Sequence, residues 1–174
     1  IYCTRSFGTK PSTLQPVLEA ISVYAARAAE KLRQQQSLTG ILQVFLHTSP
    51  FDELHYSNSS LVQLPYPTDD TRLIVNAARQ VIKKLFKPGF RYMKAGIGLL
   101  DLSSRRQRQL DLFEPGQHVR DDALMQVLDS INTRYGRNSV YIAAEGVHKK
   151  WFMRQAYKSP AYTTRWEDLP AVQC

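Results

Sequence analysis

The sequence predicts an α+β fold: a split β-α-β unit in which an antiparallel four-stranded sheet carries two helices on one face. Three observations predict it. Strand-like and helix-like patterns follow one another in the order βαββαβ. Each helix-like stretch has a single apolar stripe to bury. The last strand-like stretch has large apolar residues on one face only, which leaves the other face of the sheet open.

The first strand is expected over residues 1–7, and a long helix follows it. Ser12 or Thr13 can cap this helix. Its apolar positions recur at the helical period and are Leu14, Val17, Leu18, Ile21, Ala25, Ala28 and Leu32. One face of the helix is therefore predicted to be buried.

Two strands are predicted next. Gly40–His47 is rich in branched and aromatic residues, which is typical of a central strand. Ser60–Pro65 indicates a shorter strand that ends at its proline. The stretch between them is rich in turn-forming residues, so the two strands are expected to form a hairpin.

The second helix is predicted to start at Thr68, Asp69 and Asp70 and to end near residues 87–89. Its apolar stripe consists of Ile74, Ala77, Ala78, Val81, Ile82 and Leu85. Lysines gather at its C-terminal end, where the helix macrodipole alone favours cations.

The last strand, residues 90–100, is expected to have two unlike faces. The face toward the helices would carry Met93, Ala95, Ile97 and Leu99. The outer face would carry Tyr92, Lys94, Gly96 and Gly98, so it is expected to be nearly bare backbone beside a positive charge. Two glycines on one face indicate either the close approach of another backbone or a bulge or tight bend, and the strand alone leaves both open.

Residues 119–174 are expected to form a small α/β subdomain. A helix opens at Asp121 or Asp122 and ends at Gly136, and a strand is predicted over Ser139–Gly146. One face of that helix would carry Leu124, Val127, Leu128 and Ile131. The subdomain core is expected to consist of Trp151, Phe152, Tyr162 and Trp166. The alternative for these aromatic residues, which alternate with basic ones, is stacking on single-stranded nucleic acid.

The composition limits the class of protein. A chain of 174 residues that is 43% hydrophobic forms one or two folded domains. Because it has no membrane-length apolar run and no signal peptide, we expect a cytoplasmic protein without a membrane partner. Its start without Met indicates a fragment of a longer chain. Cys3 and Cys174 are expected to be free thiols.

The net charge of +8 at pH 7 suits a polyanionic partner, and an open sheet face in a basic domain indicates nucleic acid. RNA-recognition modules have the same element order but stack bases on aromatic residues of the central strands. The last strand here has glycines where rings are needed. Tracking of a duplex backbone, with phosphate contacts and little base readout, therefore fits better.

No catalytic or metal site is predicted in this chain. The acidic pairs at residues 69–70 and 121–122 lie where helices begin, which the helix dipole explains. The pair at residues 52–53 lies in a loop without a third ligand, and the histidines have no metal-ligand spacing. We expect no catalysis and no cofactor in the fragment.

Leu110, Leu112 and Phe113 lie in a stretch of charge, amide, proline and glycine that offers nothing to bury them. They either fold back onto the protein's own surface or bind a partner. The neighbouring arginines Arg105, Arg106 and Arg108 are expected to be solvated, and the alternative is that they steer an acidic partner or DNA.

Several segments together resemble the C-terminal part of the UmuC-like subunit of DNA polymerase V, a Y-family lesion-bypass polymerase. They are "TRSFG" at residue 4, "YAARAAEKLR" at 24, "HTSPF" at 47, "RYMKAGIGLLDL" at 91 and "SPAYTTRWEDLPAV" at 159. The resemblance implies a little finger domain at residues 1–101 that grips DNA, a linker at 102–118, and a family-specific subdomain at 119–174. It also implies that the palm carboxylates, which hold Mg²⁺ in the full-length polymerase, precede Ile1.

The resemblance also implies site residues and partners. The pentapeptide of Gln109, Leu110, Asp111, Leu112 and Phe113 is similar to the motif by which bacterial polymerases bind the sliding clamp. The residues expected to contact DNA are Arg5, Ser6, Lys94, Gly96 and Gly98. Further partners are UmuD-type accessory subunits and the recombinase filament. An alternative from another class is a stand-alone RNA- or protein-binding module with a ferredoxin-like sheet.

Overall fold

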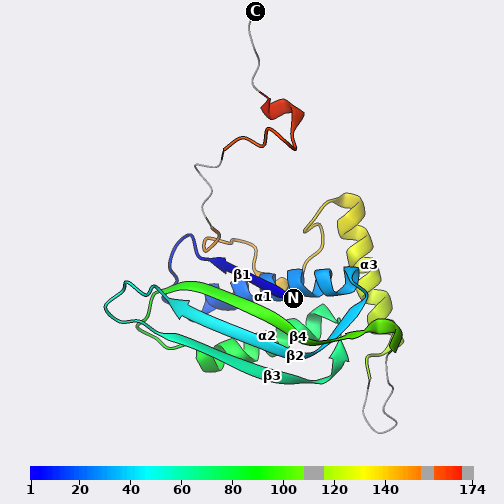
Figure 1. Cartoon of the computed structure of the whole chain (residues 1–174), viewed down its shortest axis with the longest axis horizontal. Helices are drawn as coiled ribbons and strands as arrows, with labels where there is room; N and C mark the ends of the chain where they lie inside the picture. The colour runs from blue at the N-terminus through cyan, green and yellow to red at the C-terminus, as the bar shows by residue number, and fades with distance from the viewer. Residues whose placement is uncertain (108–115, 154–158, 170–174) are drawn as a thin grey trace, which may run out of the picture.

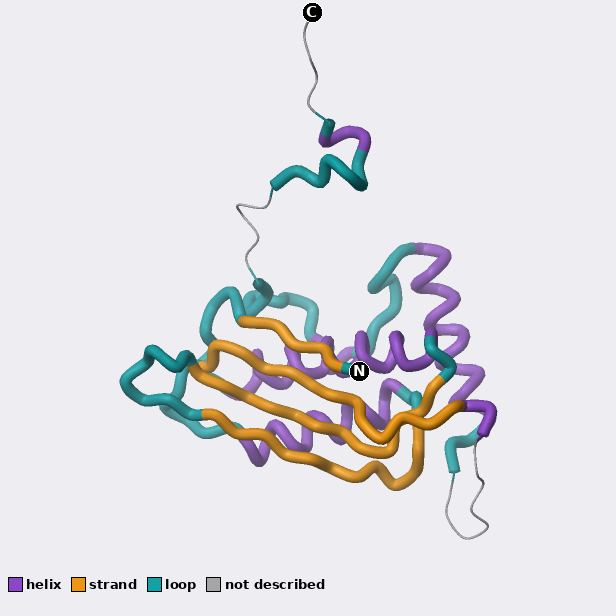
Figure 2. The backbone as a smooth tube through the Cα atoms, in the orientation of Figure 1, coloured by secondary structure: helices purple, strands orange, loops and turns teal. Residues whose placement is uncertain are grey.

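The computed structural model describes residues 1–107, 116–153 and 159–169 (Figure 1). One antiparallel sheet has the strand order β1-β4-β2-β3. Its strands are β1 (Tyr2–Ser6), β2 (Ser37–Thr48), β3 (Ser57–Thr68) and β4 (Tyr92–Ser104). Helices α1 (Leu14–Gln34) and α2 (Thr71–Leu85) cover one face of it (Figure 2). The predicted α+β fold and its element order are confirmed.

Helix α1 is the central element of the core. Its predicted apolar face is buried, with Leu14 partly so, and Tyr24 on the same helix is 1% exposed. Thr13 is the N-cap residue, but its side chain makes no capping hydrogen bond. Packing of the apolar face therefore fixes the position of this helix more than its cap does.

Helix α2 starts one residue after its cap, Asp70, whose carboxylate accepts a hydrogen bond from the Arg72 backbone N–H at 2.8 Å. Its predicted stripe faces α1 and the sheet, and only Ala77 of that stripe is partly exposed. The inner residues of β2 and β4 complete the core, which includes Leu42, Val44 and Ile97.

Strand β3 is longer than predicted. The expected end at Pro65 is wrong, because the strand continues through Pro65 and Pro67 to Thr68. The register jumps there: Gln63 lies opposite Ile41, whereas Thr68 lies opposite Thr39. A proline lacks the backbone donor that a regular ladder needs, and an edge strand with an irregular register tolerates that loss.

Tyr92 corrects the predicted parity of the last strand. Lys94 pairs with His47 but Tyr92 pairs with Thr48, so the register shifts at Met93. Tyr92 consequently points into the core and is fully buried. Its hydroxyl donates to the Lys87 carbonyl at 2.9 Å and accepts from the Lys87 N–H at 2.8 Å. Burial raises the pKa of this hydroxyl.

The C-terminal part departs most from the prediction. Helix α3 (Val119–Tyr135) ends at Gly136 as expected, with φ of 99°, but its N-cap is His118 rather than an aspartate. Leu124 and Val127 are exposed, 45% and 55%, so the predicted apolar face is not the packed one. The strand expected at 139–146 is wrong, because residues Ala143–Glu145 form a short 3-10 helix. None of the described residues beyond 118 forms a strand.

The expected aromatic core of a separate subdomain is also wrong. Trp151 is 3% exposed and belongs to the core of the sheet and helices. Its ring meets Phe7 and Tyr24 edge-on, with centroids 6.4 and 6.0 Å away, and its indole N–H donates to Glu19 at 3.3 Å. By contrast, Trp166 is 88% exposed. Residues around Trp151 therefore complete the first domain rather than a second one.

Candidate nucleic-acid interface

The outer face of the sheet is the surface where the sequence placed DNA contacts. α1 and α2 both lie behind the sheet, on its other side (Figure 1). One row of this face runs across all four strands, with Ser6 beside Lys94, Lys94 beside His47 and His47 beside Ser57. Ser6 and Lys94 are thus brought together, as a shared phosphate contact requires.

His47 is a polar member of this row. Its Nδ1 lies 2.6 Å from the Ser57 hydroxyl oxygen. Burial, together with the nearby charge of Lys94, lowers the pKa of His47. At neutral pH the ring therefore stays uncharged, and Lys94 supplies the positive charge of the row.

The glycines do not leave bare backbone, so that expectation is wrong. Gly96 and Gly98 are buried. A Cβ at Gly96 would collide with the Phe45 ring and lie 2.7 Å from Thr4 Cβ, and one at Gly98 would lie 2.6 Å from the Tyr2 ring. The glycines make room for rings from the neighbouring strands, which form the outer surface in their place.

Aromatic rings therefore stand on the outer face. Tyr2 is 54% exposed, and its hydroxyl donates to Gln43 Oε1 at 2.8 Å. The rings of Phe45 and His47, both on the central strand β2, lie 5.1 Å apart. Sequence reasoning missed these rings, because it considered the glycines of β4 without their cross-strand partners. Base stacking was set aside because the last strand has glycines where rings are needed, and that argument no longer holds.

Arg5 does not lie on the same face as Ser6 and Lys94. It pairs with Ala95, which points into the core, so Arg5 projects toward the helix side at the edge of the sheet. Cys3 has the same parity. Burial raises the pKa of the Cys3 thiol, and the charges of Lys31, Arg27 and Arg5 oppose that shift. Arg5 thus belongs to a cationic edge rather than to the outer face.

A group of polar residues joins the end of β4 to the starts of α2 and α3, and we call it the Asp69 junction. It consists of Thr68, Asp69, Arg105, Gln117 and Asp122. Arg105 binds Asp69 and Asp122, each at 3.0 Å. The Gln117 amide donates to Asp69 at 2.9 Å and to Asp122 at 2.6 Å, while its carbonyl accepts from the Thr68 hydroxyl at 2.6 Å. The expectation that Arg105 is solvated is therefore wrong.

A buried arginine lies beside this junction. Arg33 is 5% exposed and binds Asp129 through two hydrogen bonds of 2.6 and 2.7 Å. It also donates to the Thr71 hydroxyl at 2.7 Å. Asp129, like Asp69 and Asp122 in the junction, is thus paired with an arginine, and these ion pairs join α1, α2, α3 and the end of β4. No group of three or more potential metal-ligating side chains exists among residues 1–107, 116–153 and 159–169.

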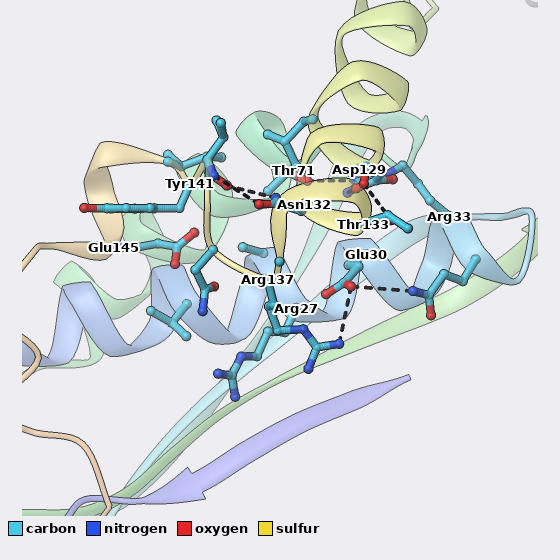
Figure 3. A pocket seen from close by; sticks show the side chains of 18 residues that line it. Arg27, Glu30, Arg33, Thr71, Asp129, Asn132, Thr133, Arg137, Tyr141 and Glu145 are labelled. Atoms are coloured by element: carbon cyan, nitrogen blue, oxygen red, sulfur yellow. Dashed lines mark hydrogen bonds and ion pairs between the residues drawn. The ribbon is translucent and has the colours of Figure 1, made fainter.

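A cavity of about 460 Å³ lies between α1, α3 and residues 136–145 (Figure 3). Its lining contains three arginines and three acidic residues. Arg33 is paired with Asp129, and Arg137 lies 3.5 Å from Glu30. Burial raises the pKa of Glu145, against the lowering effect of Lys149. The three arginines and three acidic residues of the lining balance in formal charge, so this cavity offers no excess charge for an ionic ligand.

The predicted clamp-binding residues 109–113 lie outside the described residues, and their role stays a prediction. The domain boundaries predicted around them also stay predictions. Strand β4 runs to Ser104, and a short 3-10 helix covers Arg105–Gln107. The expected linker at 102–118 therefore begins as a strand and ends in the Asp69 junction at Gln117.

Comparison with known proteins gives the family. The model of the impB/mucB/samB family C-terminal domain matches residues 1–112, and a domain of unknown function (DUF4113) matches residues 122–172. Protein UmuC of Salmonella typhimurium is 41% identical over 99% of this chain and 42% of its own length. Protein MucB of Escherichia coli is 38% identical over 98% of this chain and 40% of its own length. An insertion ternary complex of Dbh DNA polymerase has 10% identity, with a TM-score of 0.42 over 56% of this chain and 27% of that one.

The fold and the face together define a small α+β domain whose outer sheet surface carries aromatic rings and Lys94. The chain belongs to the impB/mucB/samB family, through that family's C-terminal domain. It spans about two fifths of the length of the curated relatives it matches. Within the described residues, no helix is both long and apolar enough to cross a membrane.

Proposed function

We propose that the chain is the DNA-holding and clamp-tethering C-terminal part of an error-prone translesion DNA polymerase of the Y family. The observation that carries the proposal is the row of Ser6, Lys94, His47 and Ser57 on an uncovered sheet face. Family membership supports it, and so does the net charge of +8. A face of this kind suits contact with phosphates.

The contacts divide by chemistry. Lys94 supplies a point charge for one phosphate, and the hydroxyls of Ser6 and Ser57 supply neutral donors on either side of it. Gly96 and Gly98 act indirectly, because they seat the Phe45 and Tyr2 rings on which sugar edges can pack. Arg5 reaches a phosphate from the edge of the sheet, beyond the row itself. Such contacts hold a duplex without reading its sequence.

Clamp binding is the second part of the proposal. In the pentapeptide, Leu112 and Phe113 would enter an apolar pocket on the clamp while Gln109 makes polar contacts. Burial of two large apolar side chains contributes about 3–6 kcal/mol before ordering costs. The expected result is a tether of modest affinity. Arg105 and Gln117, which flank the segment, both bind Asp69, so the segment leaves the domain and returns to it at the Asp69 junction.

Catalysis is assigned to a different part of the polymerase. Metal-assisted phosphoryl transfer needs carboxylates that hold two ions, and the proposal places these and Mg²⁺ in a palm domain.

The tail after residue 118 is the proposed contact for UmuD-type subunits and the recombinase filament. The proposed location is the cytoplasm, at the nucleoid.

A second candidate function is binding of single-stranded RNA. One observation favours it: Phe45 and His47 stand on the central strand of the open face, where RNA-recognition modules carry their stacking rings.

A mobility-shift titration of the chain separates the two functions. Primer–template DNA and single-stranded RNA are each titrated at two salt concentrations. The polymerase proposal expects tighter binding of primer–template, with affinity that falls steeply as salt rises. A preference for single-stranded RNA contradicts it and supports the second function.

A further inference from the structure

The loop between β2 and β3 displays two apolar side chains in water. Phe51 is 95% exposed and Leu54 is 74% exposed. Figure 1 shows this loop, at the left, extending past the ends of β2 and β4. An isolated exposed apolar residue is ordinary on a protein surface. A phenylalanine held almost wholly in solvent, at the tip of a projecting loop, is a natural anchor for a partner.

The loop has a built structure that holds Phe51 outward. At its neck, the Thr48 N–H donates to the Tyr56 carbonyl at 2.9 Å, and the Tyr56 N–H donates to the Thr48 hydroxyl at 2.8 Å. At its tip, the Phe51 N–H donates to the Ser49 hydroxyl at 3.3 Å, and Asp52 is bound by Lys10 at 2.9 Å. The ring is therefore displayed by a tied backbone, which lowers the ordering cost of binding.

Cations lie around this loop, alongside its own acidic residues Asp52 and Glu53. The Lys87 ammonium lies 4.8 Å from the centroid of the Tyr56 ring, at the loop neck. The hydrogen bond from Lys10, together with the charges of Lys10 and Arg91, lowers the pKa of Asp52. Lys87 and Arg91 form no ion pair with any residue in the described ranges. A projecting apolar ring on a loop with Lys87 at its neck and Arg91 near Asp52 suits a partner that combines a flat aromatic group with a phosphate.

The position of the loop fixes which part of a nucleic acid would meet it. The row that contains His47 and Ser57 is the last on the outer face before the loop, because β2 ends at Thr48 and β3 begins at Ser57. A duplex that is held by Lys94 and runs along the strands would extend past the sheet at the loop. The first nucleotides beyond its paired end would therefore lie nearest to Phe51.

We infer that Phe51 is a base-stacking site that takes an unpaired nucleotide at the end of the duplex bound on the outer face. The inference rests on the proposed DNA-binding function. The cations beside the loop would bind the phosphates that flank this nucleotide, and the ring would provide a sequence-independent platform, since every base has an aromatic face.

The test compares two DNA ligands in the full chain. One is a primer–template with a single-stranded overhang that carries 2-aminopurine, a fluorescent base, at its first unpaired position. The other is the same duplex with blunt ends. We expect Phe51→Ala to weaken binding of the overhang ligand about 5- to 100-fold, to leave the blunt duplex unchanged, and to remove the quenching of 2-aminopurine that stacking causes.

Controls separate this inference from the proposed function. Phe51→Trp should retain the quenching, whereas Trp166→Ala, at another exposed ring, should change neither ligand's affinity. Lys94→Ala should weaken both ligands alike. The stacking site is overturned if Phe51→Ala binds the overhang ligand as tightly as the unaltered chain does. It is also overturned if Phe51→Ala weakens both ligands equally. Neither result contradicts the proposed function. If the unaltered chain binds neither ligand, both ideas are wrong.

Discussion

Arg105 and Asp69 form an ion pair of 3.0 Å that joins the end of β4 to the start of α2. Asp69 is fully buried, and the Arg105 side chain is 20% exposed. Because the carboxylate has no contact with bulk water, it depends on Arg105 and Gln117 for its stability. The pair is therefore a point where the domain and the segment after it are held together.

Arg105→Met should lower the free energy of unfolding by about 3–5 kcal/mol, because it leaves a buried charge without its cation. Urea denaturation measures the change. Arg106→Met is the matched control, since Arg106 is exposed and its side chain forms no ion pair with the described residues. Addition of Asp69→Asn to Arg105→Met should recover part of the loss. Equal stabilities for the two single variants contradict the role assigned to the pair.

Trp151→Ala should destabilise the sheet domain by about 3–5 kcal/mol, because it opens a cavity beside Phe7 and Tyr24. The signal to follow is the unfolding of the whole domain, measured by circular dichroism. Trp166→Ala removes an equally large ring that is 88% exposed and should change stability by about 0.5 kcal/mol or less. A small effect at Trp151 would mean that its packing contributes nothing to the fold.

Gly96→Val should destabilise the protein by about 1–3 kcal/mol, although valine favours strands, because its Cβ meets Thr4 and the Phe45 ring. Ser59→Val, at an exposed position of the same row on β3, is the control and should be nearly neutral. Phe45→Ala combined with Gly96→Val should restore much of the loss, as thermal melts would show. If the effects of the two substitutions simply add, the Phe45 ring does not pack over Gly96.

Lys94→Ala should weaken binding of primer–template DNA and reduce the slope of log affinity against log salt by about 1. Lys83→Ala, an exposed lysine on the helix layer, carries the same charge change and should leave that slope unaltered. Titrations over a range of salt concentrations give both slopes. Identical slopes for the two variants remove Lys94 from the interface.

Leu112→Ala with Phe113→Ala should abolish binding of the bacterial sliding clamp, measured by surface plasmon resonance, because the two side chains provide the apolar contact. Leu124→Ala with Val127→Ala removes two exposed apolar side chains of α3 and should leave clamp binding intact. Binding that survives the first pair of changes refutes the motif assignment.

The periodic parts of the sequence predicted the fold well. The helical stripe from Val17 to Leu32 and the alternation from Ala95 to Leu99 each reflect one buried face, and both faces are buried as predicted. Such patterns are local, so a single sequence reveals them. The inward orientation of Tyr92 was not predicted, because the register shift beside it depends on the partner strand β2. That shift has no signature in the residues of β4 themselves.

The candidate site was harder to predict, because its properties arise across strands. In the sequence of β4 alone, Gly96 predicts bare backbone, whereas in the structure the ring of Phe45 from the neighbouring strand covers it. Arg5 and Ser6 are adjacent in the chain, yet strand alternation puts them on opposite sides of the sheet. Trp151 was assigned to a tail core since nothing local links it to Glu19, which lies far away in the sequence. Long-range pairing of this kind needs coordinates.

The two family regions meet between residues 112 and 122, yet Trp151, from the second, fills the interior of the first. We therefore expect the segment that holds Trp151 to unfold together with the sheet domain, across the boundary between the two family regions. A chain divided there would leave Phe7 and Tyr24 facing water on one piece and an unsheltered indole on the other. Cleavage between the regions should thus lower the melting temperature of the sheet itself, and adding the severed piece back should raise it again.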